Sequence, residues 1–490
     1  MSAAAIEGAR PAWEMVVGLE VHVQLRTETK AFCACSSSFG DPPNTNICPV
    51  CLALPGALPV LNDACIELAV RAALALGCTV HGTSVFARKN YFYPDLPKGY
   101  QISQYDKPLA TGGALEVTLG EARHRIGVTR VHMEEDAGKS IHDRFDGATA
   151  IDLNRAGVPL IEIVSEPDLR ASAEAGAYLR ALKQVLEYAD ISDCSMELGS
   201  LRVDANVSAR PRGSAELRSR TEIKNLNSFS AVEKALELEF ARHCAVYEAG
   251  GTLSQQTMLW DATRGEVRPA RSKEGSHDYR YFPEPDLPPL VVPAARVERE
   301  RRALPEFPAA KIARYQAEFG LAAGEAGVLV ASAPLARYFE SVAELVTQPR
   351  AAANWVSGAV LQALNERSLD PAAAASLVPA DRLAALIGLA TAGTISSSAA
   401  KAVFAAMLAD PEATPARIVQ EQGLAQVSDD GALVTWIDEV LAEHPDEAKR
   451  FLAGERKLQG VLIGFVMKKS KGSADPKRLS QLLATRVAPP

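Results

Sequence analysis

Segments with alternating hydrophobic and polar positions dominate the first 290 residues of the chain. Between Trp13 and Leu25, Leu and Val occupy the odd positions from 19 onward, and the even positions 20 to 24 carry Glu20, His22 and Gln24. Successive side chains in a strand point to opposite faces, so this segment predicts a strand with one apolar and one polar face. Such a polar face is either solvated or lines a polar cavity. The same alternation in Leu201–Ser208 gives a polar face of Arg202, Asp204, Asn206 and Ser208.

Other periodicities extend this picture. Apolar residues at helical spacing predict helices over Ile66–Leu76, Ser172–Tyr188 and Ser230–Tyr247. Ile151–Glu166 is typical of two strands around an Ala-Gly turn. Arg220–Ser228 predicts another strand, in which one face carries Arg220, Glu222 and Lys224.

Beyond Val292 the sequence becomes alanine-rich and helix-periodic, after a proline cluster suited to a domain boundary. We therefore expect an α+β domain followed by an all-helical C-terminal region. The expected segments are a disordered leader (1–12), a catalytic domain (13–293) with a zinc-binding hairpin (33–51), a helical domain (294–400) and a helical basic tail domain (401–490).

Composition places the chain among soluble globular proteins of two or three domains. It has 490 residues, 47% of them hydrophobic and 23% charged, with a net charge of −8. No apolar run reaches transmembrane length, and the N-terminus lacks the basic and apolar regions of a secretory signal. We expect a cytoplasmic protein that is not coated by nucleic acid over its whole surface.

The last forty residues depart from this acidic balance. They hold eight basic and two acidic residues, a net charge of +6. Ordinary solubilising charge is one interpretation. The other is a tail that binds a polyanion, with the candidate residues Lys457, Lys468, Lys469, Lys471, Lys477 and Arg478.

Three consecutive carboxylates, Glu134, Glu135 and Asp136, lie within Thr129–Ser140. Adjacent like charges repel, so a folded chain keeps them either in open water or around a cation. The following Gly-Lys-Ser suggests a phosphate-binding loop, but that motif needs a glycine where Met133 stands, which excludes it.

Two close cysteine pairs, Cys33/Cys35 and Cys48/Cys51, flank a turn-rich loop. Each pair supplies two thiolates from one tight turn, which suits tetrahedral Zn²⁺ better than a disulfide in an intracellular protein. Four cysteines leave no open coordination position, so the predicted zinc site is structural. The remaining four cysteines are expected to be buried thiols.

Arg88–Asp106 contains four tyrosines, a phenylalanine, two prolines and several basic residues. It is either an aromatic surface loop or, as we favour, a substrate-facing loop that stacks a base or positions phosphates.

Together the polar faces offer carboxylates and an imidazole, which suit Mg²⁺ and the phosphates that it carries. As magnesium ligands we expect Glu20, His22 and Glu135 first, with Glu134 and Asp204 completing the catalytic set. Phosphoryl transfer is the matching reaction class. The residues expected to bind the substrate and neutralise the transferring phosphoryl group are Lys89, Lys98, Arg202, Arg220 and Lys224.

The sequence contains no amidase-type Gly-Ser-Ser-Gly run, no Gly-x-Ser-x-Gly elbow and no defensible Cys-His pair. If the enzyme forms an amide, it must therefore receive its nitrogen from elsewhere.

Several long segments resemble the GatB family, the B-type subunit of the tRNA-dependent aspartyl/glutamyl amidotransferase. The similarity extends from near Trp13 to the C-terminus, where Leu458–Lys468 resembles the tail of that family. The other segments are Val17–Gln24, Arg88–Asp106, Val131–Lys139, Asn154–Asp168, Thr221–Ser228 and His277–Asp286.

This resemblance implies a catalytic domain similar to the glutamine synthetase fold. It implies that ATP phosphorylates the side-chain carboxylate of glutamate or aspartate mischarged on tRNA, and that ammonia then displaces phosphate. The ammonia is expected from an amidase-type glutaminase subunit, in a heterotrimer whose third member is a small subunit. Family members differ in whether they keep the four zinc cysteines, and this chain has all four.

Two other functions are compatible with parts of the sequence. A non-catalytic zinc-ribbon RNA-binding adaptor predicts no ATP turnover, and it leaves the regular mixture of His, Asp, Asn and Arg on the strand faces unexplained. A stand-alone metal-dependent hydrolase leaves the basic tail unexplained. The sequence leaves open whether Glu-tRNA(Gln), Asp-tRNA(Asn) or both are substrates.

Overall fold

The computed structural model describes residues 12–120, 122–270, 279–427, 429–470 and 472–486. It divides the chain into two compact units, residues 1–307 and 308–490. The expected leader, apart from Ala12, lies outside the described residues, as do His277 and Lys471. The combination of an α+β first unit with a helical second unit confirms the expected fold class at this level.

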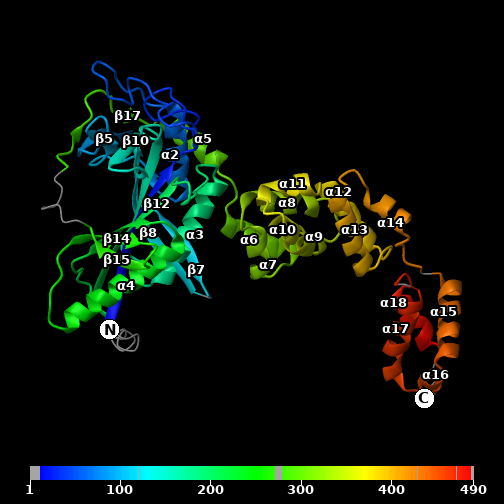
Figure 1. The fold of residues 1–490 in the computed structure, drawn as a ribbon. Coiled ribbons are helices and arrows are strands. Elements are labelled where there is room, and N and C mark those ends of the chain that lie inside the picture. Colours follow the sequence, from blue (N-terminus) through cyan, green and yellow to red (C-terminus); the bar gives the residue numbers. More distant parts are fainter. Residues whose placement is uncertain (1–11, 121, 271–278, 428, 471, 487–490) are drawn as a thin grey trace. The chain divides into compact units, whose positions relative to one another are not determined.

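A ten-stranded sheet forms the centre of the first unit (Figure 1). Strand β1 (Trp13–Gln24) lies in the interior of this sheet, between β12 and β11. Its strand order is β15-β14-β13-β12-β1-β11-β8-β6-β2, with β7 paired to β8. All neighbours are antiparallel except β13 and β14. The bounds are β2 (Thr79–Val80), β6 (Ala110–Thr111), β7 (Ala114–Leu119), β8 (Ala122–Glu135), β11 (Pro159–Ser165), β12 (Leu201–Pro211), β13 (Thr221–Leu226), β14 (Gln256–Asp261) and β15 (Glu266–Pro269).

The predicted parity of β1 is confirmed, because Leu19, Val21 and Val23 are almost completely buried in the core of this unit. They share that core with α2 (Asp63–Ala75), α3 (Ser172–Tyr188) and α4 (Phe229–Glu248). The three helices match the predicted ones within three residues at each end. Burying this apolar side of the sheet leaves the opposite, polar side for the candidate site.

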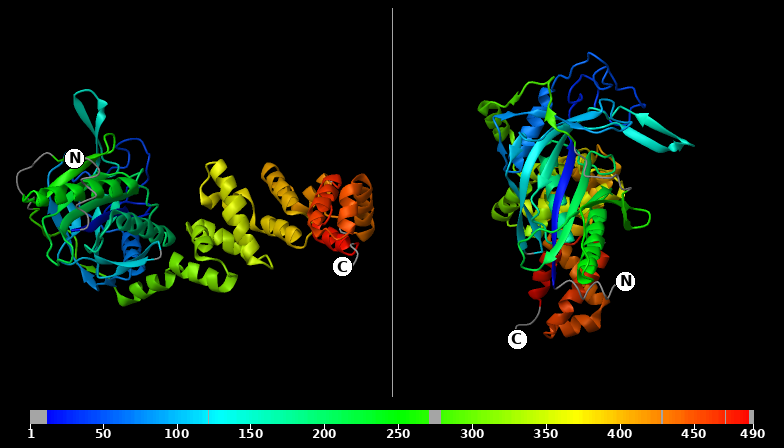
Figure 2. Two further views of the ribbon diagram at one scale, coloured as in Figure 1. Left: turned by 90° about the horizontal axis from the view of Figure 1, so that it is seen from below. Right: turned by 90° about the vertical axis from the view of Figure 1, so that its left-hand side faces the viewer.

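Smaller sheets complete the first unit. The predicted aromatic loop overlaps two strands that pair with each other, β4 (Phe86–Asn90) and β5 (Tyr100–Gln104), and β4 also pairs with β16 (Phe282–Pro283). The rings of Tyr105 and Tyr281 stack at 4.2 Å next to this sheet. β3 (Thr83–Ser84) pairs with β17 (Leu290–Val291), and β9 (Lys139–Phe145) with β10 (Ala148–Asp152) forms a ribbon that projects from the unit in both views of Figure 2.

The boundary of the first unit differs from the expected residue 293. Helix α5 (Ala294–Ala303) packs against α2, and three ion pairs join them, the most buried being Arg71–Glu300 at 2.9 Å. This helix therefore belongs to the first unit, which extends to Phe307. Alanine-rich helical sequence marks a change of composition, but it does not reveal which neighbours a helix packs against.

Every named element of the described residues beyond 307 is a helix. Two hydrophobic cores divide them, one running from Tyr315 to Val419 and one from Leu433 to Leu483. The expected boundary at residue 400 falls inside α13, so the division lies later in the chain. The bounds are α6 (Pro308–Phe319), α7 (Ala323–Leu329), α8 (Ala333–Ala343), α9 (Pro349–Trp355), the π-helix Val356–Val360, α10 (Leu361–Glu366), the short helix Pro371–Ala373, α11 (Ala374–Leu377), α12 (Ala380–Thr391), α13 (Ser397–Ala409), α14 (Pro415–Gln422), α15 (Asp430–Glu443), α16 (Pro445–Leu452), the short helix Arg456–Leu458, α17 (Gln459–Lys469) and α18 (Pro476–Ala484).

No single helix in the described part of the chain is long and apolar enough to cross a membrane. One bent pair, Pro371–Leu377 with Ala380–Thr391, passes that test by length and composition.

A buried polar network fastens α4 to β13. Glu239 of α4 is almost completely buried, receives hydrogen bonds from Arg242, and lies 3.2 Å from Nε2 of His243. The same Nε2 lies 2.9 Å from the hydroxyl of Thr221 at the start of β13. Burial raises the pKa of Glu239, but the hydrogen bonds from His243, Arg242 and Thr221 outweigh it and lower the pKa to about 2.

We expect Glu239→Gln to reduce the free energy of unfolding of the first unit at pH 7 by about 3 kcal/mol. In the wild type, the contribution of this carboxylate is complete above its ordinary pKa of 4.5 and is lost as the pH falls toward 2. The variant should therefore show a weaker pH dependence in this window. Amide hydrogen exchange of β13 in the full chain, corrected for intrinsic rates, measures the difference.

Glu233→Gln on the same helix is the matched control. Glu233 forms a partly exposed ion pair with Arg180, which contributes little to stability. An equal pH dependence in both variants would contradict the role given to Glu239.

Candidate active site

The polar side of the large sheet collects charged residues from five neighbouring strands. Strand pairing places Glu20 directly opposite Asp204, and His22 directly opposite Glu162. These positions are on the face of β1 that points away from the buried Leu and Val residues, because side chains alternate along a strand. The charged residues fall into two clusters.

The first cluster consists of His22 on β1, Glu134 on β8 and Glu162 on β11. Their ligand atoms all lie within 4.8 Å of one another, and Nδ1 of His22 lies 2.8 Å from Oε1 of Glu134. A second histidine, His132, places its Nε2 3.3 Å from Glu162. His132 and both carboxylates are almost completely buried. An imidazole with two carboxylates at this spacing suits a divalent cation such as Mg²⁺ or Mn²⁺.

Electrostatics couple the members of this cluster. Burial lowers the pKa of His22, but the hydrogen bond to Glu134 and the charges of Glu134 and Glu162 outweigh it and raise the pKa to about 9. Burial raises the pKa of Glu162, whereas His132, His22 and Lys89 lower it by more. Glu162 therefore remains ionised although it is buried, as a cation ligand must be.

The second cluster consists of Glu20 on β1, Asp204 on β12 and Glu222 on β13, again with ligand atoms within 4.8 Å of one another. The ammonium group of Lys224 lies 2.6 Å from Asp204 and 2.8 Å from Glu222. Burial raises the pKa of Glu20, and the charges of Glu162, Glu222 and Asp204 raise it further. These carboxylates therefore need positive charge nearby, which Lys224 supplies in part.

The two clusters adjoin because Glu20 and His22 are two positions apart on β1. A cavity of about 350 Å³ lies beside the second cluster, lined by Glu20, Asn206 and Arg220 among others. Burial lowers the pKa of Lys89, but the nearby Glu134, Tyr281 and Glu162 outweigh burial and raise the pKa. Lys89 therefore interacts with the first cluster. Carboxylate clusters beside ammonium and guanidinium groups are the surroundings that a phosphoryl group requires.

The structure does not bring Glu135 together with Glu20 and His22, as we had expected. Glu134 and Glu135 are successive residues of one strand, so only one of them points to the polar face, and that is Glu134. On the other face, Glu135 pairs with Lys98 and accepts a hydrogen bond of 2.9 Å from the backbone N–H of Ile102. Lys98 is thus engaged with Glu135, and Arg202 with Asp136 at 2.8 Å.

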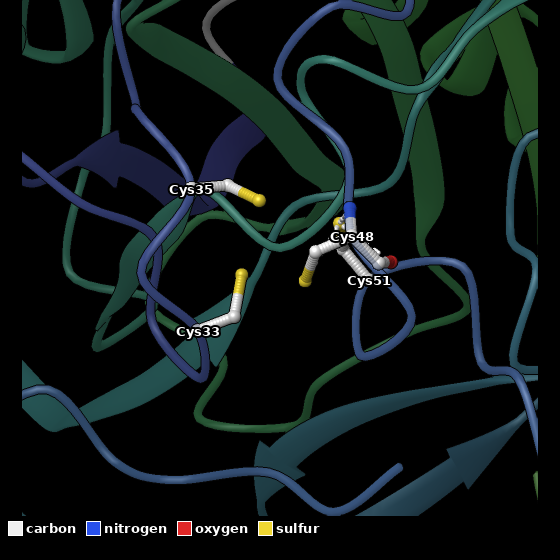
Figure 3. A group of neighbouring side chains, drawn as sticks. All are labelled: Cys33, Cys35, Cys48 and Cys51. Carbon is white, nitrogen blue, oxygen red and sulfur yellow. Dashed lines mark hydrogen bonds between the residues drawn. The ribbon is translucent and has the colours of Figure 1, made fainter.

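The four predicted metal-binding cysteines also come together. All four sulfur atoms lie within 4.8 Å of one another, and those of Cys48 and Cys51 are 3.8 Å apart. Figure 3 shows the pair Cys33/Cys35 facing the pair Cys48/Cys51. A tetrahedron with metal–sulfur bonds of about 2.3 Å has edges of about 3.8 Å, so the thiols fit a single tetrahedral metal ion. The remaining cysteines, as predicted, are buried thiols: Cys65, Cys78, Cys194 and Cys244.

Comparison with known proteins identifies the family to which this chain belongs. The GatB/GatE catalytic domain model matches residues 15–298, and the GatB domain model matches residues 337–487. Relatives named as the B subunit of aspartyl/glutamyl-tRNA(Asn/Gln) amidotransferase include those of Prosthecochloris aestuarii and Chlorobaculum tepidum, each 52% identical over 475 residues. These alignments cover 97% of this chain and 98% and 99% of the relatives. That of Moorella thermoacetica is 51% identical over 477 residues, 97% of this chain and 100% of its own.

The chain belongs to the family of aspartyl/glutamyl-tRNA amidotransferase B subunits. The resemblance seen in its sequence is thereby confirmed. Both carboxylate clusters and the four cysteines fall within the residues matched by the catalytic-domain model of this family.

Five of the six tail residues predicted to bind a polyanion, here expected to be tRNA, lie within the described residues and fall into two groups; the sixth, Lys471, lies outside them. Lys469 pairs with Glu443 at 2.6 Å, and Arg478 pairs with Asp430 at 2.6 Å, so both are engaged within the chain. Lys457, Lys468 and Lys477 are exposed and form no ion pair with any residue that the structure describes.

Glu162 of the first cluster and His132, which contacts it, were missing from the predicted set. The sequence around each of these two residues does indicate that it is unusual. Glu162 interrupts the otherwise apolar strand Pro159–Ser165, and His132 shares the parity of Glu134. A charged residue inside a strand that is apolar on both faces indicates a buried partner.

We expect Glu134→Gln to weaken Mn²⁺ binding by roughly tenfold or more, because it removes a buried carboxylate charge from the first cluster. Mn²⁺ serves as the probe, and its binding is measured by electron paramagnetic resonance. Glu135→Gln is the matched control, since it changes the neighbouring residue on the other face. It should keep the affinity for Mn²⁺ and reduce the free energy of unfolding by about 3 kcal/mol, because Lys98 loses its buried partner. Weakened binding in the second variant alone would reverse the assignment.

Proposed function

We propose that this chain is the member of a heterotrimeric amidotransferase that activates mischarged Glu-tRNA(Gln), Asp-tRNA(Asn) or both. The supporting observation is the pair of carboxylate clusters on one sheet face, with Lys89, Lys224 and Arg220 around them. The names of the relatives specify these two tRNAs. The proposed reaction is that of an ATP-dependent carbon–nitrogen ligase, on a domain similar to the glutamine synthetase fold.

In the first proposed step, the side-chain carboxylate on the tRNA attacks the γ-phosphorus of ATP, and ADP leaves. An acyl phosphate forms and one phosphoanhydride bond breaks. If bound by the two clusters, Mg²⁺ would supply charge neutralisation for the phosphate oxygens. Lys89 and Arg220 would supply further positive charge. The residues that would hold the cations are Glu20, His22, Glu134, Glu162, Asp204 and Glu222.

In the second proposed step, ammonia attacks the acyl carbon, phosphate leaves, and the amide of Gln-tRNA or Asn-tRNA results. Since the sequence offers no amide-cleaving nucleophile, glutamine hydrolysis belongs to a separate amidase-type glutaminase subunit, and a third, small subunit joins the complex. The Cys33, Cys35, Cys48 and Cys51 site is proposed to hold a structural Zn²⁺, because four thiolates complete its coordination.

The test uses the complex of this chain with the proposed glutaminase and small subunits, mischarged tRNA, Mg²⁺ and γ-labelled ATP. We expect phosphate release that depends on the mischarged tRNA, at least about a hundredfold slower in Glu134→Gln. This chain alone should hydrolyse no glutamine. Tight tRNA binding without ATP turnover in the wild-type complex would instead support a non-catalytic RNA-binding adaptor, and glutaminase activity in the isolated chain would contradict the division of roles.

The exposed lysines of the second unit are proposed to hold the tRNA body through phosphates. Replacing Lys457, Lys468 and Lys477 together by Ala should weaken tRNA binding and reduce the slope of log affinity against log salt by about two. The matched control is Lys469→Ala with Arg478→Ala, which removes basic residues that already have acidic partners. Titration of tRNA across a salt series measures both. Identical slopes in the wild type and the triple variant would show that these lysines do not contact the tRNA.

A further inference from the structure

Lys30 is a completely buried lysine in the segment that leads from β1 to the cysteine hairpin. Its ammonium group donates hydrogen bonds to the backbone carbonyls of Asn46 at 2.7 Å and Leu153 at 3.3 Å. Within the described residues it forms no ion pair with a carboxylate. These two carbonyls satisfy part of its hydrogen bonding but carry no net charge that would offset that of the ammonium.

A buried charge without a counter-charge is strongly unfavourable. Lys311 in the second unit shows the usual solution, since this buried lysine pairs with the carboxylate of Glu340 at 2.6 Å. Lys30 has no such partner in the described residues, so its counter-charge must come from a different kind of group.

The cysteine cluster lies next to Lys30. The backbone N–H of Lys30 donates to the carbonyl of Cys35 at 3.0 Å, and Asn46, which accepts from its ammonium, precedes Cys48 by two residues. Lys30 and Cys51 also flank Gly157. A Cβ placed on this glycine would lie 3.5 Å from Cδ of Lys30 and 3.8 Å from Cβ of Cys51.

Charge connects the two groups as well. Four thiolates around a divalent ion carry a net charge of −2, and the ammonium of Lys30 is the cation placed to offset it.

We propose that Lys30 is the buried counter-ion of a tetrathiolate metal centre on Cys33, Cys35, Cys48 and Cys51. It is a positioning residue, since it touches no metal and acts through the thiolates and the backbone around them. This inference rests on the structural metal ion of the proposed function.

The position of Lys30 extends the effect of the metal centre toward the acidic strand. Besides Lys30 and Cys51, the third neighbour of the missing Cβ of Gly157 is Oε2 of Glu135, at 3.8 Å. Gly157 has a φ of +86°, a conformation that other residues rarely adopt, and a Cβ there would be in van der Waals contact with all three groups. The counter-ion, the cysteine hairpin and the end of β8 therefore pack around one glycine, so loss of the metal should loosen the strand that carries Glu134.

The test compares zinc retention and stability in the full chain. Lys30→Met removes the charge and keeps the length of the side chain, and Lys311→Met is the control for losing a buried lysine elsewhere. Zinc content is measured first, then the rate of zinc release to a chromogenic chelator. We expect release about tenfold faster or more in Lys30→Met, the usual scale for an outer-shell partner, and unchanged in Lys311→Met.

A second readout separates a counter-ion from a purely structural lysine. If Lys30 balances the metal centre, the fall in melting temperature caused by Lys30→Met should be larger with zinc than in chelator-treated protein. Equal falls in both states, or unchanged zinc release, would overturn the proposal. If Lys30→Met does not fold, Lys30→Arg, which keeps the charge, should retain zinc better than Lys30→Gln, which keeps only a donor, and equal retention would overturn it. Wild-type protein that binds no zinc would instead refute the proposed structural metal ion.

Discussion

Like charges held close together on one sheet face are the constraint on which the first unit depends. Strand pairing fixes Glu20 beside Asp204 and His22 beside Glu162, and it leaves these groups no freedom to separate. The raised pKa of Glu20 reflects burial and this repulsion. The apolar face of the same strands, packed against α3 and α4, holds the register in place. A slip of one residue would turn the charged set into the apolar core.

Two adjacent residues at the end of β8 have different roles. Glu134 joins the cluster on the polar face, whereas Glu135 binds Lys98 and the backbone of β5 on the other face. A single acidic run thus contributes to the candidate cation site and also fastens a smaller sheet to the large one. Asp136 continues the run by pairing with Arg202 of β12. Substitutions in this run therefore affect chemistry or stability according to the parity of the residue.

The basic residues are likewise divided between different roles. Lys224 lies between two carboxylates of the second cluster, and Lys30 lies beside the cysteine hairpin. In the second unit, Lys469 and Arg478 connect helices through ion pairs, while Lys457, Lys468 and Lys477 face solvent. A count of basic residues in the tail therefore overstates the positive charge that is available to bind a polyanion.

The sequence by itself determined the features that depend on neighbours along the chain. Alternation defined β1 and β12 and their polar faces, helical spacing located α3 and α4, and cysteine spacing identified the four thiols that come together. Tertiary structure alone decided that Glu134 and not Glu135 meets His22, that Glu162 and His132 join them, and that α5 belongs to the first unit. The parity of one strand says which residues share a face, but which face meets another strand follows from long-range pairing. The same reason explains Lys30, whose role rests on Leu153, Gly157 and Cys51, which folding brings to it from distant parts of the chain.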